Sequence, residues 1–337
     1  MDHPMSEVIR WIDGTLKPRA CTSVEFIYDD MDSQSGRSLP IIYQPFDIGD
    51  RGHWEGRGAL FDFLHSTRGE GRRLLDFGPG DGWPSLIVAP YAREVVGVDG
   101  SLNLINVCRE NSRRLGIRNT AFIHYEPGHP LPFPDEGFDG VMAASSLEQT
   151  PAPKAVLMEL FRVLRSGGCL RISYEALNRY RGGEECGVWL YGLTDASSRL
   201  MIYDRKIDEE YTVQYGLTIS MTISEVQGVL GGSHPKFDMI TVERLEGVLP
   251  AIEDAMVCEL THPSGRTLAS WMEEVGFSEV HPTHDGSTFA GRLFDTLPKD
   301  ERPEDMEGLD EMLRPLVGVV VEMAAPLEED PMITAVK

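Results

Sequence analysis

A run of alternating glycines follows a short apolar stretch in the first third of the chain. Residues 74–77 (Leu-Leu-Asp-Phe) lead into Gly-Pro-Gly-Asp-Gly at positions 78–82, and Pro84 stands where a helix would begin. Glycines let a strand turn tightly and let the backbone approach a ligand that a Cβ would exclude. Proline suits the first turn of a helix. Ligands of open α/β sheets bind at this position, beyond the carboxyl ends of the strands.

Two acids near this loop indicate which ligand it binds. Asp99 ends the next apolar run, and an acid about 20 residues beyond a glycine loop can accept hydrogen bonds from ribose hydroxyls. A dinucleotide favours the spacing G-x-G-x-x-G, whereas here the spacing is G-x-G-x-G and Trp83 takes the place of the third glycine. Asp76 would repel a pyrophosphate and attract the ammonium group of a methionine tail. The pattern therefore favours S-adenosylmethionine over NAD.

Three further stretches carry a family resemblance. Residues 131–139 read LPFPDEGFD, residues 162–168 read RVLRSGG with Ser166 where proline is usual, and residues 271–277 give a weaker match. With the glycine loop, they resemble class I S-adenosylmethionine-dependent methyltransferases. The similarity is greatest to the small-molecule enzymes of the ubiquinone/menaquinone-biosynthesis type. It covers about residues 70–175.

The resemblance implies a cofactor site. The loop glycines would pass beneath the methionine part, Asp76 would hold its amino group, Asp99 would bind the ribose, and Gly100 to Leu102 would line the adenine. The complete implied set is Asp76, Phe77, Gly78, Pro79, Gly80, Gly82, Asp99, Gly100, Ser101, Leu102, Glu126, Pro127 and Ser145. One departure concerns the adenine contact, because relatives carry Gly-Asp-Ala before the LPF motif and this chain offers only Glu126, one place early.

The catalytic group stays open. Relatives have Leu-Glu-His after the fourth strand, but here the sequence is Leu147-Glu148-Gln149, so a common candidate base is missing. Glu148, Gln149 and Glu175 are the weak candidates, each of which could equally cap a helix or face solvent. A base is needed only if the acceptor must lose a proton; otherwise placement of the acceptor supplies much of the acceleration.

Other candidate residues lie outside these motifs. His53 and Trp54 precede the expected first core helix, where Trp54 and Tyr43 either cover the cofactor or pack in the core. His281, His284 and Asp285 have a loosely metal-like spacing along an expected strand and turn. We expect no metal there, and the five scattered cysteines show no CxxC spacing for zinc or an iron–sulfur cluster.

The elements that position these residues alternate between strand and helix. This pattern predicts an α/β fold, a Rossmann-like and mostly parallel sheet with helices on both faces. The expected strands are 73–77, 94–98, 120–124, 138–143 and 169–174. Ser101 can cap a helix at 102–115 that Gly116 ends, and Pro153 can open a helix at 154–164 that Gly167-Gly168 ends.

The flanking regions show other patterns. Helical spacing at residues 8–16 and apolar runs at 24–28 and 39–43, joined by a polar loop at 29–37, indicate an N-terminal helix and hairpin. Residues 213–223 alternate with a period of two, which predicts a half-buried strand, and a second strand is expected at 237–242. The last expected elements are a helix at 266–275, a strand near 280, a helix at 306–324 interrupted at Pro315, and a strand at 331–336.

We therefore divide the chain into four regions. Residues 1–50 are an N-terminal extension or lid, 51–175 the cofactor-binding core, 176–262 an inserted α+β cap over the substrate region, and 263–337 the completion of the core sheet.

Bulk composition limits the partners. The 337 residues carry a formal charge of −23, which repels phosphate backbones and anionic lipid surfaces, so neither nucleic acid nor membrane is expected. The first residues lack the basic and apolar regions of a signal peptide, and free cysteines suit a reducing cytoplasm. A small molecule is the expected substrate, and the N-terminal hairpin could serve a homodimer as easily as it serves a lid.

Three functions remain in competition. The first is methyl transfer to O, C or N of a small organic acceptor. The second is a regulatory or partner protein that binds S-adenosylmethionine without turning it over, which the missing histidine favours. The third is a NAD-dependent oxidoreductase, which the glycine spacing and Asp76 disfavour. The acceptor itself cannot be read from the fold, because one core hosts many acceptors.

Overall fold

The computed structural model describes residues 5–33, 45–177, 179, 186–231, 240–329 and 331–337. The chain divides into two compact units. Unit 1 comprises Met1–Ser35 and Ala176–Pro263, and unit 2 comprises Gly36–Glu175 and Ser264–Lys337. Residues 1–35 thus group with residues 176–263, which sequence analysis treated as a separate extension and cap.

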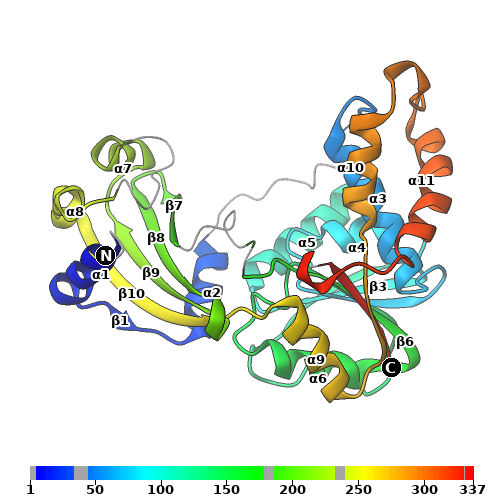
Figure 1. The fold of residues 1–337 in the computed structure, drawn as a ribbon, viewed down its shortest axis with the longest axis horizontal. Helices are drawn as coiled ribbons and strands as arrows, with labels where there is room; N and C mark the ends of the chain where they lie inside the picture. The colour runs from blue at the N-terminus through cyan, green and yellow to red at the C-terminus, as the bar shows by residue number, and fades with distance from the viewer. Residues whose placement is uncertain (1–4, 34–44, 178, 180–185, 232–239, 330) are drawn as a thin grey trace. The chain divides into compact units, whose positions relative to one another are not determined.

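Unit 2 contains the mostly parallel sheet that sequence analysis predicted (Figure 1). Its strand order is β11-β12-β6-β5-β2-β3-β4, and β12 is antiparallel to both of its neighbours while the other pairs are parallel. The strands are β2 (Arg73–Phe77), β3 (Glu94–Asp99), β4 (Thr120–His124), β5 (Phe138–Ala144), β6 (Leu164–Ser173), β11 (Ser278–Thr283) and β12 (Met332–Val336). The strand order reverses beside β2, which makes its carboxyl end the expected ligand position.

The helices of unit 2 are α3 (Arg51–Ser66), α4 (Trp83–Val88), α5 (Leu102–Leu115), α6 (Pro153–Val163), α9 (Gly265–Val275), α10 (Gly286–Thr296) and α11 (Met306–Val320). The predicted caps of α5 are confirmed: Ser101 Oγ accepts from Leu104 N, and Gly116 ends the helix in the left-handed region. The predicted interruption at Pro315 is wrong, because α11 runs through it. Pro315 is exposed, so water can satisfy the carbonyl whose helical partner it lacks.

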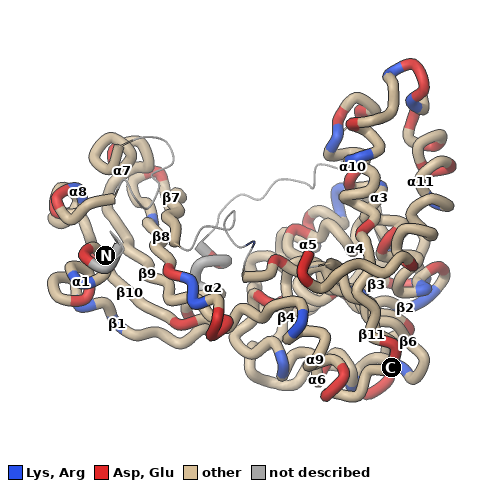
Figure 2. Tube along the Cα trace, viewed as in Figure 1, with Lys and Arg blue, Asp and Glu red and all other residues tan. Residues whose placement is uncertain are grey.

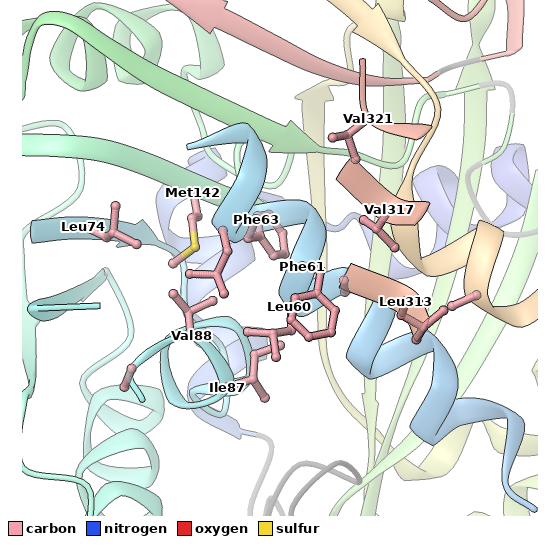
Figure 3. Close-up of a cluster of buried hydrophobic side chains, with 14 of the residues drawn as sticks. Leu60, Phe61, Phe63, Leu74, Ile87, Val88, Met142, Leu313, Val317 and Val321 are labelled. Atoms are coloured by element: carbon pink, nitrogen blue, oxygen red, sulfur yellow. The ribbon is translucent and has the colours of Figure 1, made fainter. Parts of the chain in front are cut away.

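Apolar side chains from α3, α4, α11 and the sheet form one core cluster in unit 2 (Figure 3). Figure 3 shows Phe63 of α3 near Met142 and Leu74 of the sheet, with Val317 of α11 beyond it. Helices α3 and α10 approach closely at glycines, since a Cβ on Gly58 would lie 2.2 Å from the carbonyl oxygen of Gly286. This packing holds the sheet rigid beneath the ligand edge.

A buried ion pair joins α3 to the sheet. Arg171 of β6 donates from Nε and Nη2 to the two carboxylate oxygens of Asp62, each at 2.8 Å. Asp62 also accepts from the backbone N of Gly286, and Arg171 from Nη1 reaches the hydroxyls of Thr283 and Thr334. The pair is therefore fully hydrogen-bonded, as a buried charge pair must be to persist.

Unit 1 is a five-stranded sheet in the order β1-β10-β9-β8-β7. Only the pairing of β1 with β10 is parallel. The strands are β1 (Arg19–Ala20), β7 (Cys186–Thr194), β8 (Ser197–Lys206), β9 (Tyr211–Ile219) and β10 (Ile252–Thr261). Side chains from α1 (Met5–Trp11), η1 (Ile12–Leu16), α7 (Ile223–Leu230) and α8 (Val242–Val248) pack on one face, and Phe26 of α2 (Ser23–Ser33) packs on the other.

Three expectations for unit 1 need correction. Residues 24–28 are not a strand and 29–33 not a loop, because both lie in α2, where Thr22 and Glu25 cap each other's backbone N–H groups. The strand expected at 213–223 ends at Ile219, since Thr222 caps α7. Of the strand expected at 237–242, residues 240 and 241 are irregular and Val242 begins α8. The apolar run 39–43, with Tyr43, lies outside the described residues.

Three features of the described residues concern acidic charge, membrane-spanning helices and metal-binding groups. Asp and Glu are distributed over both units (Figure 2). Among the described residues, no helix combines the length and apolar character needed to cross a membrane. The described His, Cys, Asp and Glu side chains form no group of three suited to a metal ion, and Asp285 instead caps α10 by accepting from Thr288 N.

Candidate functional site

The glycine loop joins β2 to α4 at the reversal point of the sheet. Gly78, Gly80 and Gly82 have φ values of +69°, +58° and +97°, a backbone region that favours glycine. Gly82 caps α4, and Pro84 lies in the first turn of that helix. The alternation of glycines thus follows from a backbone that enters the left-handed region three times within five residues.

Two of these glycines have different surroundings. A Cβ on Gly78 would lie 2.4 Å from Ser146 Cβ, so close packing against the loop after β5 excludes a side chain there. A Cβ on Gly80 would meet no heavy atom within 4 Å. The backbone at Gly80 therefore faces open space, which is the condition for a ligand to lie against it.

Asp76 is a buried carboxyl beneath this loop. Its Oδ2 accepts a hydrogen bond of 2.6 Å from Ser85 Oγ in α4, whereas its Oδ1 is buried and has no hydrogen-bond partner among the described residues. Burial raises the pKa of Asp76 to about 7, against the opposing effect of the Ser85 hydrogen bonds, and the nearby charge of Asp99 adds to the rise. An ammonium group next to Oδ1 would satisfy this oxygen and favour the ionised carboxylate.

Asp99 ends β3, the neighbour of β2. Its Oδ1 accepts from Ser101 N at 2.8 Å, and Ser101 in turn caps α5. Leu102, the first residue of α5, is 50% exposed, which is unusual for leucine so near the sheet. The structure thus brings a carboxylate and an exposed apolar side chain together at one strand end, as a ribose and an adenine ring would require.

The loop after β4 contributes less than the resemblance implies. Glu126 is exposed, and its Oε2 lies 3.7 Å from the ring nitrogen Nδ1 of His129. Among the described residues, its carboxylate forms no hydrogen bond or ion pair with Asp99 or the glycine loop. Tyr125 is buried instead, with its ring centroid 6.1 Å from that of Phe77. Pro127 is half-buried in the same loop. An adenine contact from this loop would therefore involve its backbone rather than the Glu126 carboxylate.

The loop after β5 is locked to the glycine loop. Ser145 adopts a φ of +50° and its N donates to Ser173 O of β6 at 2.8 Å. Ser146 Oγ donates to Phe77 O at 2.6 Å, which fixes this loop against the end of β2. Gln149 is exposed and its Nε2 donates to Ser145 O. The strain at Ser145 is thus offset by hydrogen bonds to two neighbouring strands.

Glu148 is a further buried carboxyl of this edge, in addition to Asp76 and Asp99. Its Oε1 accepts from the backbone N of Glu175 at 2.9 Å, and its Oε2 is buried without a hydrogen-bond partner among the described residues. Burial raises the pKa of Glu148 to about 7, and the nearby Glu175 carboxylate, which is exposed, adds to the rise. Of the three weak catalytic candidates, only Glu148 combines burial with a raised pKa.

Two side chains of α5 donate hydrogen bonds to the backbone of the glycine loop. The Cys108 thiol donates to Gly80 O, with sulfur and oxygen 3.2 Å apart, and Asn111 Nδ2 donates to Asp81 O at 2.8 Å. Both side chains are buried. The sequence alone did not predict the roles of Cys108, Asn111, Ser85 and Ser146. Each bonds a residue 9 to 69 positions away along the chain. Only the helical spacing of Cys108 and Asn111 toward one face could have signalled their role.

Several predicted residues lie elsewhere. His53 and Trp54 do not precede α3 but belong to it, and Trp54 is buried with its ring edge-on to Phe294. Trp54 is therefore a core residue. The LPF motif is also structural: Arg162 of α6 donates to the carbonyl oxygens of Leu131 and Phe133 and so fixes the loop before β5.

The residues present fit a cofactor with a cationic amino-acid tail and an adenosine. Asp76 offers a buried, unpartnered oxygen, Gly80 offers open backbone, and Asp99 offers a carboxylate one strand away. A pyrophosphate would meet the Asp76 carboxyl, and no arginine or lysine of the described residues pairs with that carboxyl. The charges of the site therefore favour S-adenosylmethionine over a dinucleotide.

Comparison with known proteins agrees with this chemistry. Residues 75–172 match the family model described as a methyltransferase domain. A demethylmenaquinone methyltransferase of Clavibacter sepedonicus is 36% identical over 145 residues, which is 43% of this chain and 55% of that protein. An uncharacterized methyltransferase of Bacillus subtilis, YcgJ, is 30% identical over 96 residues, which is 28% of this chain and 38% of that protein.

The similarity is confined to part of each relative. A phosphatidylethanolamine N-methyltransferase of Cereibacter sphaeroides is 34% identical over 125 residues, covering 33% of this chain and 61% of that protein. The chain thus spans less than two thirds of the length of each of these curated relatives. Among solved structures, the CcbJ methyltransferase of Streptomyces caelestis aligns with a TM-score of 0.46 at 15% identity, over 87% of this chain and 98% of that one.

Proposed function

We propose that this protein transfers a methyl group from S-adenosylmethionine to O, C or N of a small organic acceptor, because residues 75–172 match the model of a methyltransferase domain and the glycine loop suits that cofactor. The buried, unpartnered Oδ1 of Asp76 is the observation that carries the proposal. Burying a carboxyl oxygen without a hydrogen-bond partner costs free energy, and the amino group of a methionine tail would supply that partner.

The proposed cofactor site has three parts. Asp76 binds the amino group, and the backbone from Phe77 to Gly82, with Pro79 and Gly80, lies along the methionine part. Asp99 accepts hydrogen bonds from the ribose hydroxyls. The adenine packs between Leu102 and the loop after β4, near Gly100, Ser101, Glu126 and Pro127. Ser145, which directly follows β5, forms the boundary of the cofactor site on that side.

When bound, S-adenosylmethionine supplies an electrophilic methyl group on a cationic sulfur. The chain must place the acceptor in line with it and exclude water. For an acceptor that loses a proton, we propose that Glu148 Oε2 receives that proton, since this oxygen is buried and unpartnered. A pKa of about 7 suits a base at neutral pH. Gln149 and Glu175 are exposed, so neither offers a buried acceptor for that proton.

The acceptor class follows from charge and from the relatives. A net charge of −23 disfavours nucleic acid and anionic membrane surfaces, and the relatives named as demethylmenaquinone methyltransferases support a small organic acceptor. We propose that the protein acts in the cytoplasm, which its five free cysteines support. Sedimentation of the purified chain would test whether it forms a homodimer.

Calorimetric titration with S-adenosylmethionine, S-adenosylhomocysteine and NADH tests the proposal. We expect micromolar binding of the first two and none of NADH, and the absence of binding by both sulfur compounds would refute the cofactor assignment. Incubation with S-adenosylmethionine and a metabolite extract should then accumulate S-adenosylhomocysteine. Binding without any such accumulation would instead identify a regulatory protein that binds the cofactor without turnover.

A further inference from the structure

One face of the unit 1 sheet carries an arginine without an anionic partner. In β8, Leu200 belongs to the apolar cluster under α1 and α7, so Arg199 and Met201 point to the opposite face. Arg199 is half-buried, and its Nε is fully buried with no hydrogen-bond acceptor among the described residues. Buried N–H groups in folded proteins usually have an acceptor, so the Nε of Arg199 has an unused capacity to donate a hydrogen bond.

A second unpartnered donor belongs to the residue opposite Arg199 on the neighbouring strand. Tyr191 of β7 is the cross-strand partner of Arg199, and residues directly opposite in an antiparallel pair share a face. The Tyr191 hydroxyl is also buried without a hydrogen-bond partner among the described residues. A phenol and a guanidinium N–H, adjacent and both lacking acceptors, can donate to the same anionic group.

No carboxylate of the sheet neutralises Arg199. Its partner on the other side is Thr218 of β9, and its neighbours along β8 on the same face are Ser197 and Met201. The next residue across is Asp254 of β10, which pairs instead with Arg19 at 3.7 Å. Among the described side chains, Arg199 therefore has no anionic partner, and its charge can act on a ligand.

The surface next to these donors is apolar and polarisable. Tyr191 packs against the cluster of Phe26, Met201 and Met256. A Cβ on Gly216 would lie 3.1 Å from Met256 Cγ and 3.4 Å from Met201 Sδ, so the two methionines meet over that glycine. Trp189, opposite Met201, is 48% exposed. Thioether and aromatic side chains favour an aromatic ring.

We infer that Arg199 and Tyr191 form a binding site for a small aromatic anion, whose ring packs beside Trp189 and the two methionines. The carboxylate or phosphate of the ligand accepts from both donors, as arginine sites for such groups do. Since the overall field of the chain repels anions, binding depends on Arg199. This site goes beyond methyl transfer and does not require it.

Calorimetry of the full chain with benzoate, phenyl phosphate and benzamide tests the inference. Benzamide has the shape of benzoate without its charge. We expect at least one of the two anions to bind with a Kd below about 1 mM and at least about tenfold more tightly than benzamide. Preference for benzoate indicates a carboxylate ligand, and preference for phenyl phosphate indicates a phosphate ester.

Variants locate the site. Arg199→Gln should weaken anion binding by about 10- to 100-fold and abolish the preference over benzamide, and Tyr191→Phe should weaken it by about three- to tenfold. Arg10→Gln is the matched control, because it makes the same charge change on α1, which packs on the other face. Tyr191→Phe removes a single oxygen, so it keeps the test valid if Arg199→Gln does not fold.

Three results would overturn the inference. The first is that neither anion binds, in which case the two donors bond water. The second is that benzamide binds as tightly as the anions. The third is that Arg10→Gln and Arg199→Gln weaken anion binding equally. Asp76→Asn, which alters the proposed cofactor site, should leave anion binding unchanged. The two proposals can therefore fail separately.

Discussion

Replacing Asp76 by asparagine separates the stability of the fold from the affinity of the site. The pKa of Asp76 is raised from 3.8 to about 7 because the folded protein buries the carboxyl. A group with a raised folded-state pKa stabilises the fold fully below its unfolded pKa, and this contribution is lost as the pH rises through the folded pKa. The wild-type protein therefore loses stability between about pH 4 and pH 7.

The magnitude follows from the shift. About three pKa units correspond to about 4 kcal/mol at most, since each unit is about 1.4 kcal/mol. Asparagine does not ionise, yet its side-chain oxygen can still accept the Ser85 hydrogen bond. Without ligand, at about pH 8, Asp76→Asn should unfold at a temperature several degrees higher than the wild type. The difference should shrink as the pH approaches 4.

Cofactor binding should change in the opposite direction. Asparagine cannot pair with an ammonium group, so S-adenosylhomocysteine should bind Asp76→Asn about 10- to 100-fold more weakly at pH 8. Thermal unfolding between pH 4 and 8 and calorimetry measure the two effects. Asp300→Asn, an exposed acid of the same unit, should change neither. A variant that is less stable than the wild type at pH 8 and binds normally would refute the reasoning.

Three further variants test the loop and the second carboxyl. Gly80→Ala should still fold, at a cost of about 1–2 kcal/mol in the free energy of unfolding, and should lose cofactor binding. The control is Gly116→Ala, which has a similar φ of +68° and open space around it, so it should lose the same stability but keep cofactor binding. Equal binding in both variants would contradict a ligand at Gly80. Asn111→Ala should raise the KM for S-adenosylmethionine several-fold with kcat nearly unchanged, because it frees the carbonyl of Asp81; a fall in kcat alone would show another role. Glu148→Gln should keep cofactor affinity in calorimetry and lower kcat by about 100-fold for an acceptor that loses a proton, and unchanged turnover would exclude Glu148 as the base.

The core of unit 2 could be predicted because its signals are local. Each parallel strand is a short apolar run, and Ser101 and Gly116 mark the ends of α5 in the sequence itself. The placement of Asp76 and Asp99 at one edge of the sheet could be predicted for the same reason, since both lie near the carboxyl ends of successive strands. The sequence therefore predicts those residues whose place in the fold follows from their position within one strand or helix.

Unit 1 and the braces of the site depend on distant contacts. The apolar run at 24–28 suits a strand by composition, but the reciprocal cap of Thr22 and Glu25 begins a helix there. Ser146 bonds Phe77 across 69 positions, and Asn111 bonds Asp81 across 30. No local pattern encodes such pairs, because they arise only after the sheet has assembled.

Asp76 and Glu148 have similarly raised pKa values but should respond to pH in different measurements. Asp76 and Glu148 each have one hydrogen-bonded and one unpartnered oxygen, and burial raises both pKa values to about 7. An ammonium group beside Asp76 lowers its pKa in the complex, so its titration governs the affinity of the free protein for the cofactor. Glu148 has no ammonium group beside it in the proposed complex, and its ionisation there governs the pH dependence of kcat. The pH dependence of kcat/KM for the cofactor should therefore contain both ionisations, and Glu148→Gln should remove the rise of kcat near pH 7 while the dependence of cofactor affinity persists.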